Sequence, residues 1–436
     1  MTPESEGGGR CAESSELGGP SIDCRHSAPR QLRSSLIAMV MHASGCWQRA
    51  FAIAALFGLG FGPVVGSAVV EGAAALDPAI SHRIDAVFAD FDRSDTPGFA
   101  VGVIERGQLV YAHGFGQANL DDDIAIGPRT AFHLASLSKQ FTGAAIALLV
   151  LDGKLSLDDP VAKYIPAAAK FGPDLKIMHL VYMTSGLPEY TSLKRKSGDP
   201  WYSAYYFTRD EAISAVMSTD HLLFKPGEKW AYSNINYMIL TRVVEIVSGE
   251  RFADFLRSRV FAPLAMTDSR VDDDSTQIVP HRAVGYAART SVIVGELAKV
   301  GVAARSEGGY VRLMRNSPHF GGSGVFSTLE DLAHWDGEWT NPIVGGPSFV
   351  ALMTKRTKFD HDKDNDLFGL VLGEFEGRRM IWYSGEDLDA STYMARFPDE
   401  GVTVVCLSNM LTGDCEGRTR KVLNILSASG RLPHAR

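Results

Sequence analysis

A serine and a lysine three residues apart are the side chains in this sequence best placed to do chemistry. Ser136 precedes Lys139, and residues 143–151 are apolar almost all round, which is the pattern of a buried helix. If the helix begins near Ser136, both side chains stand on one face with Cβ atoms about 5–6 Å apart. Ser136 then lies in the first turn, where unpaired N–H groups and the helix dipole favour negative charge. The pattern predicts a nucleophilic serine beside an amine.

The surroundings of Lys139 favour a functional lysine over a structural one. Ser-x-x-Lys is a common tetrapeptide, and a helix start with Ser136 or Ser138 as its cap and a solvated lysine is the simplest alternative. A lysine at the mouth of a buried helix lies near the core, however, where an amine loses its charge readily. Burying an amine costs free energy, and a fold does not usually retain such a cost without a use. We therefore expect Lys139 to serve Ser136.

A tyrosine and an asparagine form a second pair of candidates. Tyr232 and Asn234 precede a predicted helix at 237–247, and Asn234 or Asn236 could cap it. A packed tyrosine and a capping asparagine explain this segment at least as well as a catalytic role. A phenol that faced an amine could act as the general base for a serine, so the pair becomes informative beside Ser136.

Taken together, these motifs resemble the serine β-lactamase and penicillin-binding-protein superfamily, closest to its class C β-lactamase and family VIII carboxylesterase branch. Ser136 and Lys139 match the S-x-x-K motif of this group, and Tyr232 and Asn234 match its Y-x-N motif. Stretches typical of the superfamily flank them in the expected order between about residues 77 and 430: 153–160, 183–188, 225–228, 321–328 and 407–409.

The resemblance implies acyl-enzyme chemistry, with no metal or organic cofactor. Ser136 would attack a carbonyl group, and Lys139 and Tyr232 would move its proton. Asn234 would hold either the substrate or Lys139. The backbone N–H of Ser136 and one from a C-terminal edge strand would bind the oxyanion.

The third motif of the superfamily departs from its usual form. Members carry K-T-G or H-x-G, whereas the corresponding strand here reads Trp382-Tyr383-Ser384-Gly385, similar to the W-x-G of family VIII esterases. Tyr383 and Gly385 are therefore predicted to bind substrate. Loss of the cation argues against β-lactams and peptidoglycan stems, because their carboxylate loses its partner. Glu386 follows Gly385, and an acid beside the oxyanion site is unusual in this superfamily.

These observations predict an exported serine hydrolase that acts on small-molecule esters or amides, most simply a carboxylesterase. A β-lactamase or D,D-peptidase is the alternative within enzymes. A catalytically silent member that binds a cell-wall or peptide ligand is the alternative outside them. The net charge of −8 over 436 residues argues against a nucleic-acid partner, since binding phosphate needs a basic face.

Residues 1–75 are predicted to be a disordered N-terminus followed by a signal peptide. A segment ending in Arg49, an apolar run at 50–70 and the small residues 73–75 together make a secretory signal. The alternative is an uncleaved membrane anchor, since the run is nearly long enough to span a bilayer. Either would be the protein's sole contact with a membrane, and both predict a periplasmic or secreted bacterial protein.

Residues 76–436 are predicted to form one hydrolase domain of the α+β class. Helices alternate with long loops in the middle of the sequence, and strands are predicted near both ends, at 99–104, 109–114, 378–383, 392–397 and 402–407. This order indicates an antiparallel sheet flanked by helices and built from both chain ends. An α/β lobe would comprise 76–154 and 325–436, with a mostly helical lobe, 155–324, inserted between them.

Four further features carry weaker signals. His133 is interpreted as a packing or entry residue rather than a base. The acidic runs at 121–123 and 360–366 lack the spacing of an EF-hand and are predicted to be solvated loops. The aromatic cluster at 201–207 is either core or the wall of an acyl pocket.

Overall fold

In the computed structural model, the fold lies within Val70–Arg436. The residues that the structure describes are 75–194, 208–274, 276–299, 301, 303, 308–313, 320–357 and 365–432. The predicted signal segment, apart from residue 75, lies outside the described residues, as do the aromatic cluster and most of the second acidic run. No helix within the described ranges is long and apolar enough to cross a bilayer.

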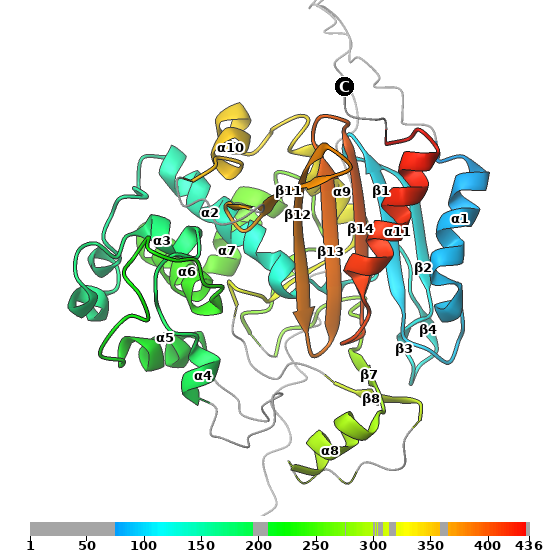
Figure 1. The fold of residues 1–436 in the computed structure, drawn as a ribbon, viewed down its shortest axis with the longest axis horizontal. Coiled ribbons are helices and arrows are strands. Elements are labelled where there is room, and N and C mark those ends of the chain that lie inside the picture. The colour runs from blue at the N-terminus through cyan, green and yellow to red at the C-terminus, as the bar shows by residue number, and fades with distance from the viewer. Residues whose placement is uncertain are drawn as a thin grey trace, which may run out of the picture. The chain divides into compact units, whose positions relative to one another are not determined.

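A seven-stranded antiparallel sheet forms the centre of this unit (Figure 1). Its strands, in spatial order, are β10 (Asn365–Asp366), β11 (Val371–Phe375), β12 (Arg378–Asp387), β13 (Ala390–Phe397), β14 (Val402–Ser408), β1 (Phe99–Glu105) and β2 (Gln108–Phe115). The N-terminal hairpin joins the C-terminal strands where β1 pairs with β14. This confirms the predicted sheet built from both chain ends.

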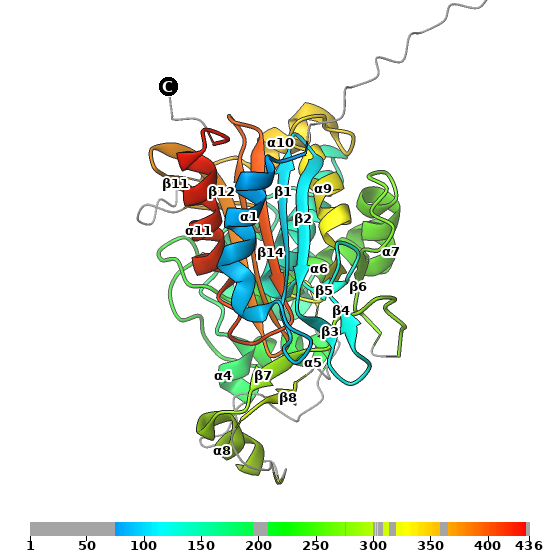
Figure 2. The same ribbon diagram turned by 90° about the vertical axis from the view of Figure 1, so that its right-hand side faces the viewer.

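Helices cover both faces of the sheet, as Figures 1 and 2 show. On one face, α1 (Pro78–Phe88) and α11 (Cys415–Ala428) pack through an apolar cluster that includes Met380 and Cys406. On the other face lie α2 (Lys139–Leu151) and α9 (Leu329–Gly337), in a cluster that includes Tyr383. Because side chains alternate along a strand, the odd-numbered residues of β12 near Tyr383 face α2 and the even-numbered ones face α11.

In the sequence, a mostly helical region separates β1 and β2 from β10–β14. Its helices are α3 (Ile177–Val181), α4 (Tyr190–Lys194), α5 (Arg209–Met217), α6 (Asn234–Ser248), α7 (Phe252–Leu256) and α8 (Ser291–Lys299), and α10 (Gly346–Met353) follows α9. Three small sheets pair β3 (Gln117–Asn119) with β4 (Ile124–Ala125), β9 (Val325–Ser327) with β5 (Phe132–His133) and β6 (Arg270–Val271), and β7 (Tyr286–Ala288) with β8 (Tyr310–Arg312). Strands of two or three residues are too short to show alternation in a sequence.

Two helix boundaries differ from those that the sequence suggests. The segment Ser-Thr-Leu-Glu at 327–330 has the pattern of a capping box that starts at Ser327. In the structure, however, Ser327 ends β9, and Thr328 caps α9 by accepting the N–H of Asp331 at 3.1 Å. The sequence also predicts a helix at 252–260, but this segment is α-helical only to Leu256 and continues as a π-helical turn, Arg257–Phe261. α6 ends at Ser248, one residue after the predicted end at 247, and Gly249 follows in the left-handed conformation (φ 76°) that glycine adopts at least cost.

A buried ion pair ties α9 to the sheet. Arg396 Nε donates to Asp336 Oδ1 at 2.7 Å, and Thr403 Oγ1 donates to the same oxygen at 2.6 Å. The two charged side chains are only 3% and 5% exposed. Burial lowers the pKa of Arg396, and the nearby Asp336 carboxylate acts in the opposite direction.

Asp336→Ala is expected to lower the free energy of unfolding by about 3–5 kcal/mol, because it leaves a buried guanidinium without its counter-ion. The matched control is Asp399→Ala, which breaks the exposed pair with Arg379 and should cost less than about 1 kcal/mol. Urea titrations of both variants measure the difference. Equal losses in the two variants would contradict this account of the pair.

Candidate active site

Ser136 lies in a 3₁₀ turn, Ala135–Ser138, directly before α2. The sequence suggested one helix from Ser136 onward, but the α-helix begins at Lys139. Ala135 has φ 49°, a left-handed conformation that is costly for a residue with a Cβ. The sharp turn leaves Ser136 partly exposed at the mouth of the helix, while Lys139 is completely buried.

Three predicted catalytic side chains meet at one point. Lys139 Nζ lies 3.0 Å from Ser136 Oγ and 2.6 Å from Tyr232 Oη, and the two oxygens are 2.6 Å apart. All three distances are within hydrogen-bonding range. The structure therefore brings together Ser136 and Lys139, which are neighbours in sequence, with Tyr232, which is 93 residues beyond the lysine.

Lys139 has two further partners that can only accept hydrogen bonds from it. Its Nζ donates to Asn234 Oδ1 at 2.8 Å and to the carbonyl of Gly322 at 2.6 Å. These two acceptors fix the position of Nζ, which lies within 3.0 Å of the hydroxyls of both Ser136 and Tyr232. Asn234 thus holds the lysine, which is one of its two expected roles.

Tyr232 differs from the other tyrosines around Lys139 in its exposure. It is 40% exposed, whereas Tyr237 and Tyr383 are buried. Burial raises the pKa of both buried phenols well above the ordinary value, so they stay protonated. Burial also raises the pKa of Tyr182 to about 12. Of these four tyrosines, Tyr232 is the one that contacts Ser136.

A glutamate that was not singled out in the sequence fixes the Y-x-N motif. Glu189 Oε2 accepts the backbone N–H of Asn234 at 2.6 Å and the hydroxyl of Ser233 at 3.1 Å. The prediction that Asn234 or Asn236 caps α6 is therefore wrong, since the carboxylate of Glu189 satisfies the helix N-terminus instead. The one feature of the sequence that could have pointed to Glu189 is its position directly after the superfamily-typical stretch 183–188.

The environment of Glu189 gives a pH-dependent prediction. Burial raises its pKa, and hydrogen bonds from Asn234 and Ser233 and the charge of Lys139 only partly offset this. The folded state thus holds this proton more tightly than the unfolded state, so its contribution to stability falls as pH rises from the ordinary carboxyl pKa through the raised one.

Glu189→Gln is expected to remove that fall in stability while keeping an oxygen that can accept the N–H of Asn234. The measurement is urea unfolding at several pH values from acid to neutral. Glu374→Gln, at an exposed position on β11, is the control and should leave the pH dependence unchanged. A Glu189→Gln variant with the pH dependence of the unchanged protein would refute this assignment.

The third motif lies on β12, with Tyr383 and Gly385 on the face toward α2. A Cβ atom added to Gly385 would come within 2.3 Å of the carbonyl oxygen of Leu134 and 2.9 Å of the N–H of Leu137, so the strand packs directly on the turn that carries Ser136. Pairing with β11 ends at Trp382, which leaves this end of β12 as an edge within the described sheet. Tyr383 stands at the position of the lysine in K-T-G, and its side chain is a neutral phenol.

Glu386 does not lie beside this site, contrary to expectation. It follows Gly385 on the opposite face of β12, where its carboxylate accepts the hydroxyl of Ser391 at 3.4 Å. Burial raises the pKa of Glu386, and so do the nearby charges of Asp414 and Glu416. These two residues lie at the start of α11. The placement of an acid beside the oxyanion site is therefore wrong.

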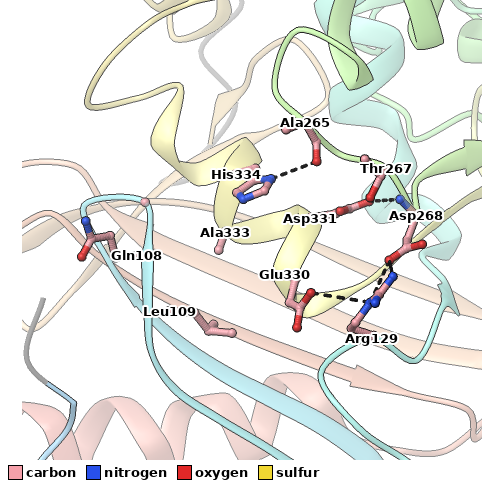
Figure 3. A pocket seen from close by; sticks show the side chains of 11 residues that line it. Gln108, Leu109, Arg129, Ala265, Thr267, Asp268, Glu330, Asp331, Ala333 and His334 are labelled. Carbon is pink, nitrogen blue, oxygen red and sulfur yellow. Dashed lines mark hydrogen bonds and ion pairs between the residues drawn. The ribbon is translucent and has the colours of Figure 1, made fainter. Parts of the chain in front are cut away.

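A separate cavity of about 590 Å³ opens between the β1–β2 turn and α9 (Figure 3). Arg129 lies between Asp268, at 2.9 Å, and Glu330, at 3.7 Å. His334 contacts the carbonyl of Ala265 at 3.1 Å. These groups pair with one another, and none of the predicted catalytic residues lines the cavity. Within the described part of the chain, no cluster of His, Cys, Asp or Glu is arranged to hold a metal.

Comparisons with known proteins identify the family to which the chain belongs. The chain is 30% identical over 325 residues to penicillin-binding protein 4* of Bacillus subtilis (strain 168), covering 70% of this chain and 66% of that protein. It therefore spans slightly less than two thirds of that relative. Among solved structures, it resembles D-amino acid amidase from Ochrobactrum anthropi SV3, with TM-score 0.66, 20% identity and coverage of 80% and 99%.

A second similar structure is EstCE1, described as a hydrolase with promiscuous acyltransferase activity, with TM-score 0.63, 20% identity and coverage of 80% and 98%. At these identities the structural matches establish the fold alone. The family model described as Beta-lactamase matches residues 84–427, which is most of the sequence. This chain therefore belongs to the Beta-lactamase family, within the serine β-lactamase and penicillin-binding-protein superfamily.

Proposed function

We propose that this protein is a serine hydrolase that cleaves small carboxylic esters through an acyl-enzyme on Ser136. One observation carries the proposal: Ser136 Oγ, Lys139 Nζ and Tyr232 Oη lie within 2.6–3.0 Å of one another. A hydroxyl in contact with both an amine and a phenol has a base within reach on two sides. The same contacts argue against a catalytically silent member of the family.

The reaction begins when Ser136 Oγ bonds to the substrate carbonyl carbon and passes its proton to Tyr232 or Lys139. The oxyanion binds to backbone N–H groups of Ser136 and β12. Collapse of this intermediate breaks the ester C–O bond, and Tyr232 returns the proton to the leaving alcohol. Water then attacks the acyl group and releases the acid, with the same residues moving the proton.

The third motif supports an ester without a nearby carboxylate. Tyr383 stands where β-lactamases and D,D-peptidases carry a cation, and its phenol is buried and neutral. A carboxylate bound there would lose water without gaining a counter-ion, which is costly. The alternative, a β-lactamase or D,D-peptidase, is favoured by the 30% identity to a penicillin-binding protein. That activity would need a cation from elsewhere in the chain.

One assay panel separates these functions. The protein is incubated with short-chain and long-chain nitrophenyl esters, a chromogenic cephalosporin and a fluorophosphonate probe, and mass spectrometry locates any adduct. The proposal predicts ester turnover and an adduct on Ser136, with little or no cephalosporin hydrolysis. Efficient cephalosporin hydrolysis would favour the β-lactamase alternative, and no adduct with any reagent would favour the silent binding protein.

Export is proposed on separate grounds. The apolar run at 50–70 and the small residues at 73–75 are typical of a secretory signal with its cleavage site. The test is expression in a bacterial host, followed by fractionation and N-terminal sequencing. A periplasmic or secreted protein that begins near residue 76 supports export and cleavage. Retention of the intact N-terminus in the cytoplasm contradicts both.

A further inference from the structure

Residues 321–325, here called the strap, lie against the start of α2. The carbonyl of Gly322 accepts from Lys139 Nζ at 2.6 Å. At the other end of the strap, the N–H of Val325 donates to Ser138 Oγ at 3.0 Å. The strap therefore supplies one of the partners of Lys139, and any movement of it would leave a fully buried N–H without an acceptor.

A buried histidine holds the middle of the strap. His133 Nε2 lies 3.0 Å from Ser323 Oγ, and the N–H of Gly324 donates to the same nitrogen at 3.3 Å. On the other side of the ring, Nδ1 lies 2.7 Å from Asp389 Oδ1. The side chains of His133 and Asp389 are 2% and 4% exposed, and the imidazole stacks on Phe326 with ring centroids 5.3 Å apart.

These contacts determine which nitrogen carries the proton. A backbone N–H can only donate, so Nε2 accepts from Gly324 and carries no proton. Nδ1 then carries it and donates to Asp389, as in a Ser-His-Asp relay. The difference from a catalytic relay is that Nε2 receives a backbone N–H as well as the hydroxyl of Ser323. A nitrogen shared between two donors is better suited to holding two groups than to removing a proton from one.

We propose that His133 and Asp389 are positioning residues for Lys139, a role that rests on the function proposed above. Asp389 fixes the tautomer of His133, whose Nε2 holds Ser323 and Gly324. Those two residues in turn keep the Gly322 carbonyl on Lys139. Together with Asn234, that carbonyl fixes Lys139 Nζ within hydrogen-bonding distance of the reacting hydroxyls. The packing role first assigned to His133 thus extends to the geometry of the catalytic lysine.

Asp389→Asn tests this chain of contacts. The amide can donate to Nδ1, which moves the imidazole proton to Nε2. Two donors, Nε2–H and the N–H of Gly324, then face each other, and their hydrogen bond is lost. The rate at which the fluorophosphonate probe labels Ser136 is expected to fall about tenfold to 10²-fold, the scale of a small misplacement in an active site. The pH profile of that rate should shift, whereas the final labelled fraction and KM for the ester should not change.

Two comparisons keep the test specific. Asp85→Asn alters another His–Asp pair, with Asp85 2.8 Å from His113 and both partly exposed, and should leave the labelling rate unchanged. Ser323→Ala removes one of the two donors to His133 Nε2 and should slow labelling less than Asp389→Asn does. It keeps the tautomer, so it also serves if the aspartate variant folds poorly.

The outcomes distinguish this inference from the function on which it rests. If the unchanged protein is not labelled on Ser136, the proposed function fails. If it is labelled and Asp389→Asn reacts at the same rate with the same pH profile, only the positioning role fails. A lower labelled fraction of Asp389→Asn at an unchanged rate would show that the substitution impairs folding alone. An adduct on Ser323 would show that Ser323 is itself a nucleophile beside His133. Either result overturns the positioning role.

Discussion

Ser136→Ala is expected to abolish ester turnover and labelling by the fluorophosphonate probe. The substitution removes the nucleophilic hydroxyl oxygen, which contacts both Lys139 Nζ and Tyr232 Oη, so no acyl-enzyme can form. In a serine protease, loss of the nucleophile costs about 10⁶ in kcat, and we expect a loss of that order here. Lys139 and Tyr232 keep their mutual hydrogen bond of 2.6 Å, so the site should stay folded.

The control for this variant lies in the same turn. Ser138 is buried and accepts the N–H of Val325, but no hydrogen bond joins it to Lys139. Ser138→Ala should therefore lose about 1 kcal/mol of stability while Ser136 remains the labelled residue. Turnover or labelling that persists in Ser136→Ala would rule out the mechanism, because neither remaining group is placed to hold an acyl intermediate.

The parts of this site that the sequence predicted are those that local geometry determines. Ser136 and Lys139 are three residues apart at a helix start, so their contact follows from the helical repeat. Tyr232 and Asn234 needed the superfamily resemblance, because the approach of a distant loop leaves no periodic signal. The same holds for the sheet. The longer strands stand out as runs of strand-favouring residues, such as 99–104 and 402–407, whereas the pairing of the two chain ends was inferred from their order.

The contacts that the sequence did not predict are long-range ones between groups of ordinary type. A glutamate after a proline, as at Glu189, or a backbone carbonyl, as at Gly322, has no distinctive pattern. Both are nevertheless within 2.6 Å of the groups that they hold. Glu386 was misplaced for a different reason: adjacency in sequence was taken for adjacency in space, although neighbouring residues of a strand point to opposite faces.

Tyr232→Phe is expected to lower kcat by about 10²–10⁴, the usual range for general acid–base help. The phenylalanine ring can fill the same space, so the loss isolates the phenolic oxygen that contacts Ser136 and Lys139 at 2.6 Å each. KM should change little, because the phenol serves proton transfer rather than binding. Labelling of Ser136 should slow by a similar factor and still reach completion.

Tyr237→Phe is the matched control for this substitution. Its ring also lies near Lys139, with Nζ 5.8 Å from the ring centroid, but its hydroxyl donates to the carbonyl of Val181 at 3.0 Å. Removing that hydroxyl should lower stability by about 1 kcal/mol and leave the labelling rate of Ser136 nearly unchanged. If the two variants lost activity equally, the loss would reflect general damage around the buried lysine, and Tyr232 would have no specific part in moving the proton.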